Sequence, residues 1–242
     1  MSLLTYDSYL GVRALVSLQQ PLTGPPNSGR MGAAEHHFIV VHQAQELLAT
    51  QCLIDLDHVG QRLRSGQSTV ALEHLGRASS IMAHLVSDLD LLENLPPDCF
   101  GELRNHLGTA SGAQSANFRE LNREISAHPA AGTAYDGLLD ELNRRGITPP
   151  TLWDEPEAVD PELRRLGDGF LQLGQRFWQW KVNHLAHVAR FIDTASGTGG
   201  TDGVSHLVRR LQLPFAELRA AAGLVSRPGT VRQPVGDRIQ NV

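Results

Sequence analysis

Three long stretches of this chain repeat apolar residues every three or four positions, and this periodicity constrains the fold more than any other feature. A repeat of three and four residues is that of an α-helix with one buried face. It predicts long helices over 35–63, 68–93 and 161–194. The stripe of the first helix is Phe38, Val41, Gln45, Leu48, Cys52, Leu56, Val59 and Leu63. No segment shows the two-residue alternation of a strand, so the sequence predicts an all-α, single-domain helical bundle.

Shorter helices are predicted between and around the long ones. They are expected over 5–19 and 98–107, from about residue 114, more weakly within 129–160, and over 203–223. Segments rich in glycine and proline, at 21–32 and 196–203, predict loops. We expect one domain over 1–225, followed by a flexible C-terminal tail over 226–242.

Composition excludes several classes of function. Of 242 residues, 41% are hydrophobic and 19% charged, which is enough to fill a core. The net charge of -5 and the absence of a basic run argue against a nucleic-acid partner. No apolar run reaches the length of a membrane span, so no membrane partner is expected. Cys52 and Cys99 indicate no disulfide framework and the N-terminus has no signal-peptide pattern, so a cytoplasmic protein is expected.

The third long helix places a histidine among aromatic residues. Its stripe is Leu173, Phe177, Trp180, His184, Val188 and Phe191. A buried imidazole needs a partner. The residues alone leave two interpretations of His184: a core histidine bonded to a carbonyl, which the pattern favours, and an axial ligand of a heme in an apolar slot.

Two further pairs share a helical face at a spacing of four. Phe38 and His42 lie in the first long helix, and Phe100 and Arg104 in the short helix over 98–107. On pattern alone His42 has a packing role and Arg104 is a solvated residue, although an arginine fork can clamp a carboxylate. The loop SGTGGTDG over 196–203 lacks the lysine and the strand of a phosphate-binding loop.

Five blocks occur in an order that resembles the tryptophan 2,3-dioxygenase family. They are LTYDSYL, QQPLT, HHFIVVHQAQELL, LENLPPDCFGELRNHLGTASGAQSANFRELN and QWKVNHLAHVARFIDTASGTGGTDGVSHL. The blocks cover roughly the N-terminal half and residues 175–220. The resemblance implies the helical-bundle fold of that family and a heme-dependent dioxygenase, acting with O2 across the indole C2–C3 bond of L-tryptophan or a substituted tryptophan to give an N-formylkynurenine-type product.

The same resemblance implies roles for particular residues. His184 is expected to bind the iron of heme b, and His42 to hydrogen-bond the indole N–H. Phe38 and Phe100 are expected beside the substrate ring. Arg104 and Thr198 are expected to hold the amino-acid end of the substrate, and Ser111 and Gly112 to lie beside the oxygen site. Tyr6, Tyr9 and Leu10 resemble a segment that contributes to a neighbouring subunit's site, which implies a homotetramer.

The chain departs from the family pattern at several positions. Ala113 stands where a phenylalanine is usual, and Thr201-Asp202 where two serines are usual. Lys181 replaces an arginine, Leu89 a tryptophan, and the chain is shorter between 125 and 170. Ala113 would reshape the substrate site, and Asp202 would add a negative charge near the glycine loop.

These departures leave other functions open. One alternative is a heme-dependent monooxygenase that hydroxylates a tryptophan derivative or tyrosine, and another is a non-catalytic heme-binding sensor, which would not need the Arg104–Thr198 pair. A helical scaffold without a cofactor and a zinc hydrolase built on His36, His37 and His187 are weaker alternatives. His36, His37 and His42 do not share one helical face, which argues against a zinc site from that helix alone.

Overall fold

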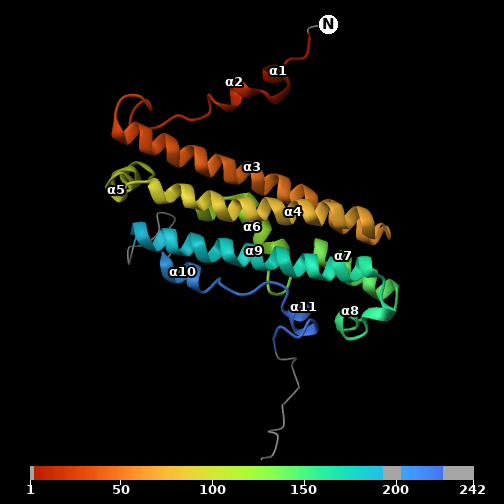
Figure 1. Ribbon diagram of the computed structural model, residues 1–242. Coiled ribbons are helices and arrows are strands. Elements are labelled where there is room, and N and C mark those ends of the chain that lie inside the picture. Colours follow the sequence, from red (N-terminus) through yellow and green to blue (C-terminus); the bar gives the residue numbers. More distant parts are fainter. Residues whose placement is uncertain (1–2, 193–202, 226–242) are drawn as a thin grey trace, which may run out of the picture.

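Three long helices form the framework of the protein and lie side by side (Figure 1). They are α3 (Arg30–Arg64), α4 (Ser68–Asp88) and α9 (Pro161–Ile192). The computed structural model describes residues 3–192 and 203–225, and this part of the chain contains helices and no strand. The predicted all-α bundle is therefore confirmed. Among the described residues, no helix combines the length and the apolar character needed to cross a membrane.

The shorter elements connect the framework and pack against it. They are α1 (Tyr6–Leu10), α2 (Val12–Leu15), η1 (Leu89–Asn94), α5 (Pro97–His106), η2 (Gly112–Gln114), α6 (Ala116–Glu124), α7 (Ala134–Arg144), α8 (Thr151–Asp154), η3 (Pro156–Ala158), α10 (Val204–Val208) and α11 (Ala216–Ala221). α6 and α7 pack against α3, and η1 packs against both α4 and α9.

A tight turn makes α3 and α4 antiparallel. Gly66 adopts φ +73°, which a glycine allows without strain, and its N–H donates to the Leu63 carbonyl at 3.0 Å. The stripe predicted for α3 is confirmed, since Val41, Cys52 and Leu56 are buried. These side chains meet apolar residues of α4 and α9 in one core.

α3 begins at Arg30, earlier than predicted, and carries the buried Glu35 near its N-terminal end. The Glu35 carboxylate accepts hydrogen bonds from the backbone N–H of Leu22 at 2.8 Å and of Thr23 at 2.7 Å, and from the Thr23 hydroxyl at 2.7 Å. These bonds hold the preceding loop against the first turns of the helix. They join residues that are distant in the sequence, so periodicity could not reveal them.

Three predicted helices are corrected by the structure. The α-helix expected over 68–93 ends at Asp88, and the chain continues as the 3₁₀-helix η1. The helix expected over 5–19 is divided into α1 and α2 at Gly11, whose φ of +64° ends α1. The helix expected over 203–223 is two short helices, because the intervening backbone bonds elsewhere: the N–H groups of Phe215 and Ala216 donate to carbonyls of Ser126 and Ala127 at 2.8 and 2.9 Å. The tail over 226–242 lies outside the described residues.

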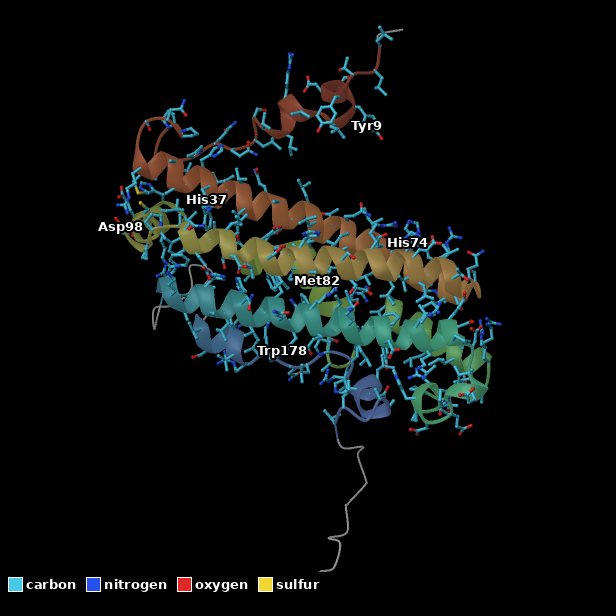
Figure 2. The ribbon with its side chains drawn as sticks, in the orientation of Figure 1. Tyr9, His37, His74, Met82, Asp98 and Trp178 are labelled. Atoms are coloured by element: carbon cyan, nitrogen blue, oxygen red, sulfur yellow. The ribbon has the colours of Figure 1, made fainter. Side chains whose placement is uncertain are left out.

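The N-terminal arm, residues 3–18, stands apart from the bundle (Figures 1 and 2). Its apolar side chains are exposed: Leu3 by 91%, Tyr6 by 77%, Tyr9 by 72% and Leu10 by 50%. Met82, in contrast, is fully buried between the long helices. The arm therefore buries little of its apolar surface on its own chain.

Candidate functional site

Three helices bring the predicted residues to one end of the bundle. The first turns of α3, the whole of α5 and the last turns of α9 lie at that end (Figure 1), and α5 contacts both α3 and α9. α3 carries Phe38 and His42, α5 carries Phe100 and Arg104, and α9 carries His184. Residues separated by more than 140 positions thus become neighbours through helix packing.

Aromatic rings connect the three helices at this end. The ring centroids of Phe38 and Phe100 are 6.0 Å apart, and those of Phe100 and Phe191 are 4.7 Å apart. Arg104 follows Phe100 by one turn of α5 and is partly buried. This end of the bundle therefore combines aromatic side chains from three helices with a partly buried arginine on α5.

The His184 ring stacks on Trp180. Their centroids are 5.0 Å apart and their planes are inclined by 5°. Trp180 in turn stacks on Phe118 of α6 at 4.5 Å. Within the described residues, neither ring nitrogen of His184 makes a hydrogen bond. The structure thus does not supply the carbonyl partner that a core histidine would have.

The protonation state of His184 follows from its surroundings. Burial lowers the pKa of His184 to about 4, with smaller contributions from His42 and His187. The imidazole is therefore neutral at pH 7, and a neutral imidazole offers a lone pair to a metal. The residue as a whole is only partly buried.

His42 is arranged differently from His184. Its Nδ1 lies 2.8 Å from the Phe38 carbonyl, and its ring lies 4.0 Å from the Phe38 ring. Because a carbonyl only accepts, Nδ1 carries the proton and Nε2 of the neutral ring is an acceptor. Burial of the ring lowers the pKa of His42, although the residue as a whole is exposed. His42 therefore carries an acceptor nitrogen, and the residue is near enough to His184 to contribute to the lowered pKa of His184.

Some of the predicted site residues make no contact with His42 or His184, or lie on the arm or outside the described residues. Ser111 caps η2, with its hydroxyl accepting from the Ala113 N–H at 3.3 Å, and no hydrogen bond or ring contact in the described chain joins Ser111 or Gly112 to His42 or His184. Tyr6, Tyr9 and Leu10 lie on the arm, away from their own chain's bundle (Figure 2). Thr198, Thr201 and Asp202 lie outside the described residues.

Trp180, next to His184 on α9, carries a buried polar atom that the periodicity did not reveal. Its side chain is 8% exposed, and its Nε1 is buried without a hydrogen-bond partner among the described residues. Such an orphaned donor is rare in a folded protein. The spacing of four residues to His184 was a usable signal, since it places both rings on one face.

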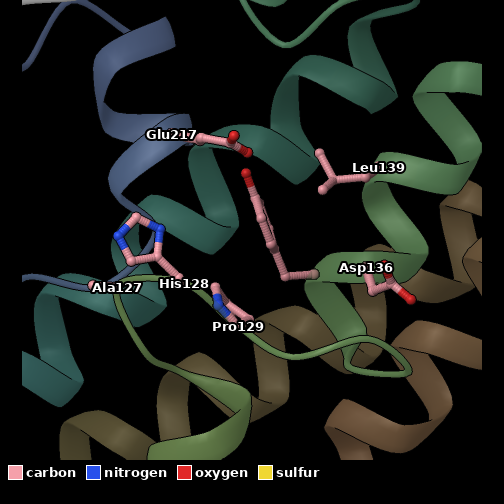
Figure 3. Close-up of a pocket in the computed structure, with 7 residues that line it drawn as sticks. Ala127, His128, Pro129, Asp136, Leu139 and Glu217 are labelled. Carbon is pink, nitrogen blue, oxygen red and sulfur yellow. The ribbon is translucent and has the colours of Figure 1, made fainter. Parts of the chain in front are cut away.

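Two hollows elsewhere in the molecule are smaller than a cofactor needs. One, of about 190 Å³, is shown in Figure 3, and its lining includes His128, Tyr135 and Glu217. The other, of about 240 Å³, lies beside Gly60 and Glu124. Neither is lined by a predicted site residue, and cofactor sites have volumes of roughly 300 Å³ or more. Neither hollow is therefore a candidate cofactor site.

Comparison with known proteins identifies the family. A family model described as tryptophan 2,3-dioxygenase matches residues 1–140. The chain belongs to the tryptophan 2,3-dioxygenase family. Among curated members, the tryptophan 2,3-dioxygenase of Anaeromyxobacter sp. (strain K) is 30% identical over 91% of this chain and 96% of its own length. That of Anaeromyxobacter dehalogenans (strain 2CP-C) is 31% identical with the same coverage, and that of Erythrobacter litoralis (strain HTCC2594) is 27% identical over 87% of this chain and 94% of its own.

The family match extends over both halves of the candidate site. Residues 1–140 include Phe38, His42, Phe100 and Arg104 but not His184. The alignment with the relative from Anaeromyxobacter sp. covers 91% of the 242 residues. The uncovered residues are too few to include α9, so His184 lies within this alignment. The resemblance seen in the sequence is thereby confirmed at the level of the family.

Proposed function

We propose that this chain is a heme-dependent dioxygenase that inserts O2 across the indole C2–C3 bond of L-tryptophan or a substituted tryptophan. The observation that carries the proposal is the pair of neutral imidazoles at the aromatic end of the bundle. His184 on α9 has no hydrogen-bond partner among the described residues, and His42 on α3 presents an acceptor nitrogen. Family membership supports the same activity.

The residues at this end fit heme b. A neutral imidazole in apolar surroundings is a typical axial ligand of heme iron, and His184 has that character. Trp180 lies one turn before His184, and its Nε1–H has no partner among the described residues. This N–H could donate a hydrogen bond to a heme propionate. We therefore assign His184 as the iron ligand and Trp180 as a donor to the heme edge.

The remaining residues would hold the amino acid. Bound heme supplies the binding and activation of O2. The Nε2 acceptor of His42 would receive the indole N–H, while the Phe38 and Phe100 rings would enclose the indole. Arg104 would clamp the carboxylate, together with Thr198. The hydrogen bond to the indole N–H and the clamp on the carboxylate together would fix the position of the indole C2–C3 bond.

The loop after α5 and the arm complete the proposed site. Ser111 and Gly112 would lie beside the oxygen position. The exposed side chains of Tyr6, Tyr9 and Leu10 would enter the site of a neighbouring chain in a homotetramer. An arm with large apolar side chains exposed by half or more is better buried against another subunit than against water.

Substitution of the proposed iron ligand tests the cofactor assignment. We expect His184→Ala to fold but to purify without heme, as read from the loss of the Soret band. His36→Ala, which replaces a histidine of α3 that has no role in the proposed site, is the matched control and should retain heme. Full heme occupancy in His184→Ala would refute the assignment.

Product analysis tests the reaction. Ferrous protein given ¹⁸O2 and L-tryptophan should yield N-formylkynurenine with two ¹⁸O atoms, as measured by mass spectrometry. A product with one ¹⁸O atom would replace the proposal with a monooxygenase, and a heme spectrum without turnover on any aromatic amino acid would replace it with a sensor. Loss of the clamp in Arg104→Gln should weaken tryptophan binding by about 2–5 kcal/mol, whereas indole, which lacks the carboxylate, should bind equally to both proteins.

A further inference from the structure

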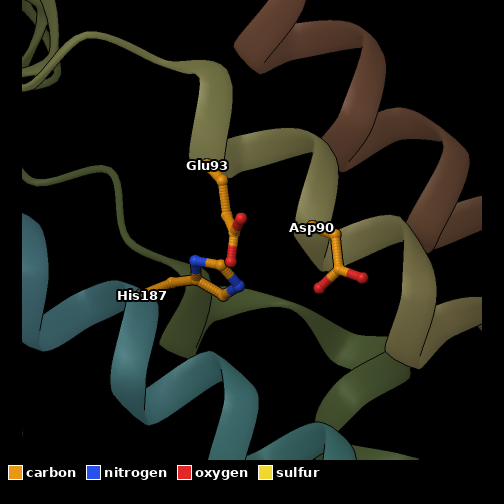
Figure 4. Close-up of side chains that lie close together, drawn as sticks. All are labelled: Asp90, Glu93 and His187. Carbon is orange, nitrogen blue, oxygen red and sulfur yellow. The ribbon is translucent and has the colours of Figure 1, made fainter.

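A second group of potential metal ligands lies next to the candidate site but is not part of it. Asp90 and Glu93 of η1 and His187 of α9 point toward one another (Figure 4). One carboxylate oxygen from each acid and one ring nitrogen of His187 lie within 4.8 Å of one another. His187 follows His184 by three residues, so this group lies about one helical turn beyond the proposed iron ligand.

The 3₁₀ geometry of η1 places the two acids together. A 3₁₀-helix has three residues per turn, so side chains three positions apart lie one above the other. Asp90 and Glu93 have this spacing within η1, and both are exposed. An α-helix continuing from α4 would have rotated them apart by about 60°. The packing of η1 on α9 then brings His187 to the same position.

The two carboxylates lack a cationic partner in the part of the chain that the structure describes. Neither forms an ion pair there. The nearby Arg190 donates from Nη1 to the backbone carbonyl of Glu93 at 2.9 Å, not to either carboxylate. Two adjacent like charges repel each other, so a cation bound between them would be stabilised by both.

His187 provides an independent reason to expect a ligand. The residue is 9% exposed, and its ring forms neither a hydrogen bond nor an ion pair with described residues. Buried imidazoles normally have a partner. In Figure 4 the ring is directed toward the two acids. The partner position is therefore the space between His187, Asp90 and Glu93.

We propose that Asp90, Glu93 and His187 bind one divalent transition-metal ion, with Zn²⁺ the best match. One imidazole nitrogen and two carboxylate oxygens form a borderline donor set that suits Zn²⁺ better than Mg²⁺ or Ca²⁺, which prefer oxygen alone. With bonds of about 2.1 Å, two ligands of Zn²⁺ lie at most about 4.2 Å apart. The exposed acids reach that separation by side-chain rotation, and water takes the remaining position.

The bound ion would tie η1 to α9. The two elements come from different parts of the chain, and α9 also carries His184 and Trp180. The ion would therefore hold the last turns of α9 in place beside the candidate site. The donor set also differs from the one predicted from the sequence, since His187 is grouped with Asp90 and Glu93 and not with His36 and His37.

Metal binding to the intact protein tests this site. Tag-free, heme-loaded protein is dialysed against a series of Zn²⁺ concentrations, and zinc and iron are measured by inductively coupled plasma mass spectrometry. We expect one Zn²⁺ per chain. The double variant Asp90→Asn/Glu93→Gln should bind Zn²⁺ at least about tenfold more weakly, and both positions are exposed, so folding should be unaffected. Asp140→Asn, an exposed acid on α7, is the matched control and should bind like the wild type.

Two results would overturn the proposal. One is the absence of stoichiometric Zn²⁺ from the wild-type protein across the series. The other is equal Zn²⁺ affinity in the wild type and in Asp90→Asn/Glu93→Gln, which would locate the zinc at other histidines. His187→Gln provides a further check, with circular dichroism to verify that this buried substitution leaves the helices intact, and it should weaken Zn²⁺ as the double variant does.

Discussion

Trp180 has two separable roles, and a pair of substitutions distinguishes them. Its ring stacks on Phe118, Phe177 and His184, with centroid distances of 4.5, 6.1 and 5.0 Å. Its Nε1–H is an orphaned donor within the described structure. Trp180→Ala removes the stack and the donor, whereas Trp180→Phe removes the donor but keeps a smaller aromatic ring.

The structure sets the expected magnitudes. Removing a tryptophan that is 8% exposed lowers the free energy of unfolding by about 4 kcal/mol, of which aromatic stacking contributes about 0.5–1.5 kcal/mol per ring pair. For a chain of this size that lowers Tm by roughly 10 °C. Trp180→Phe removes fewer atoms, so its loss should be about 1–2 kcal/mol. Losing a hydrogen bond to a charged propionate should weaken heme binding about tenfold in both variants.

Two assays measure these quantities independently. Urea unfolding of the heme-free protein, followed by far-ultraviolet circular dichroism, gives the free energy of unfolding. Transfer of heme from the holoprotein to excess apomyoglobin gives the rate of heme loss. We expect Trp180→Ala to change both quantities and Trp180→Phe to change mainly the second. If Trp180→Ala unfolds at the wild-type urea concentration, the stack contributes nothing; if Trp180→Phe releases heme at the wild-type rate, the donor assignment is wrong.

Three further predictions follow from individual residues. Burial lowers the pKa of His42 below its ordinary value of 6.5, so the imidazole stays mostly neutral down to pH 6.5. We therefore expect kcat/KM for tryptophan to stay constant from pH 8 to 6.5 and to decline only below pH 6.5. A decline centred above pH 6.5 would contradict this. The fully buried Asp55 carboxylate accepts from Arg77 and His74 at 2.9 Å, and Asp55→Asn should lower the free energy of unfolding at pH 7 by about 3 kcal/mol. Burial raises the pKa of Asp55, but hydrogen bonds to Arg77 and His74 outweigh burial and lower the pKa below its ordinary 3.8. The stabilisation is therefore present above pH 4 and disappears as the pH falls further, which urea titrations at pH 7 and pH 3 would measure. Tyr9→Ser should leave the unfolding of the heme-free chain unchanged, because the side chain is 72% exposed. It should reduce both kcat/KM and the tetramer fraction on size-exclusion chromatography. If neither value changed, the arm would have no role in the site of a neighbouring chain.

Local patterns in the sequence determined the helices and the positions along them that matter. The three- and four-residue repeat predicted α3, α4 and α9 together with their buried faces, including Val41, Leu56 and Phe177. The same repeat placed His42 one turn after Phe38, and His184 one turn after Trp180. A helix is defined by hydrogen bonds between residues four apart, so its register can be read from the chain itself.

Only the tertiary structure decided what those helices place together. Periodicity treats each helix separately, so it could not show that Phe100 on α5 contacts Phe191 on α9, or that His187 lies near Asp90. Nor could it show that Nε1 of Trp180 is buried without a partner in the described part of the chain. The division of the last predicted helix depended likewise on backbone bonds to Ser126 and Ala127. These features arise because burial and backbone hydrogen bonding are satisfied by the folded chain as a whole, and the partners that satisfy them lie far away in sequence.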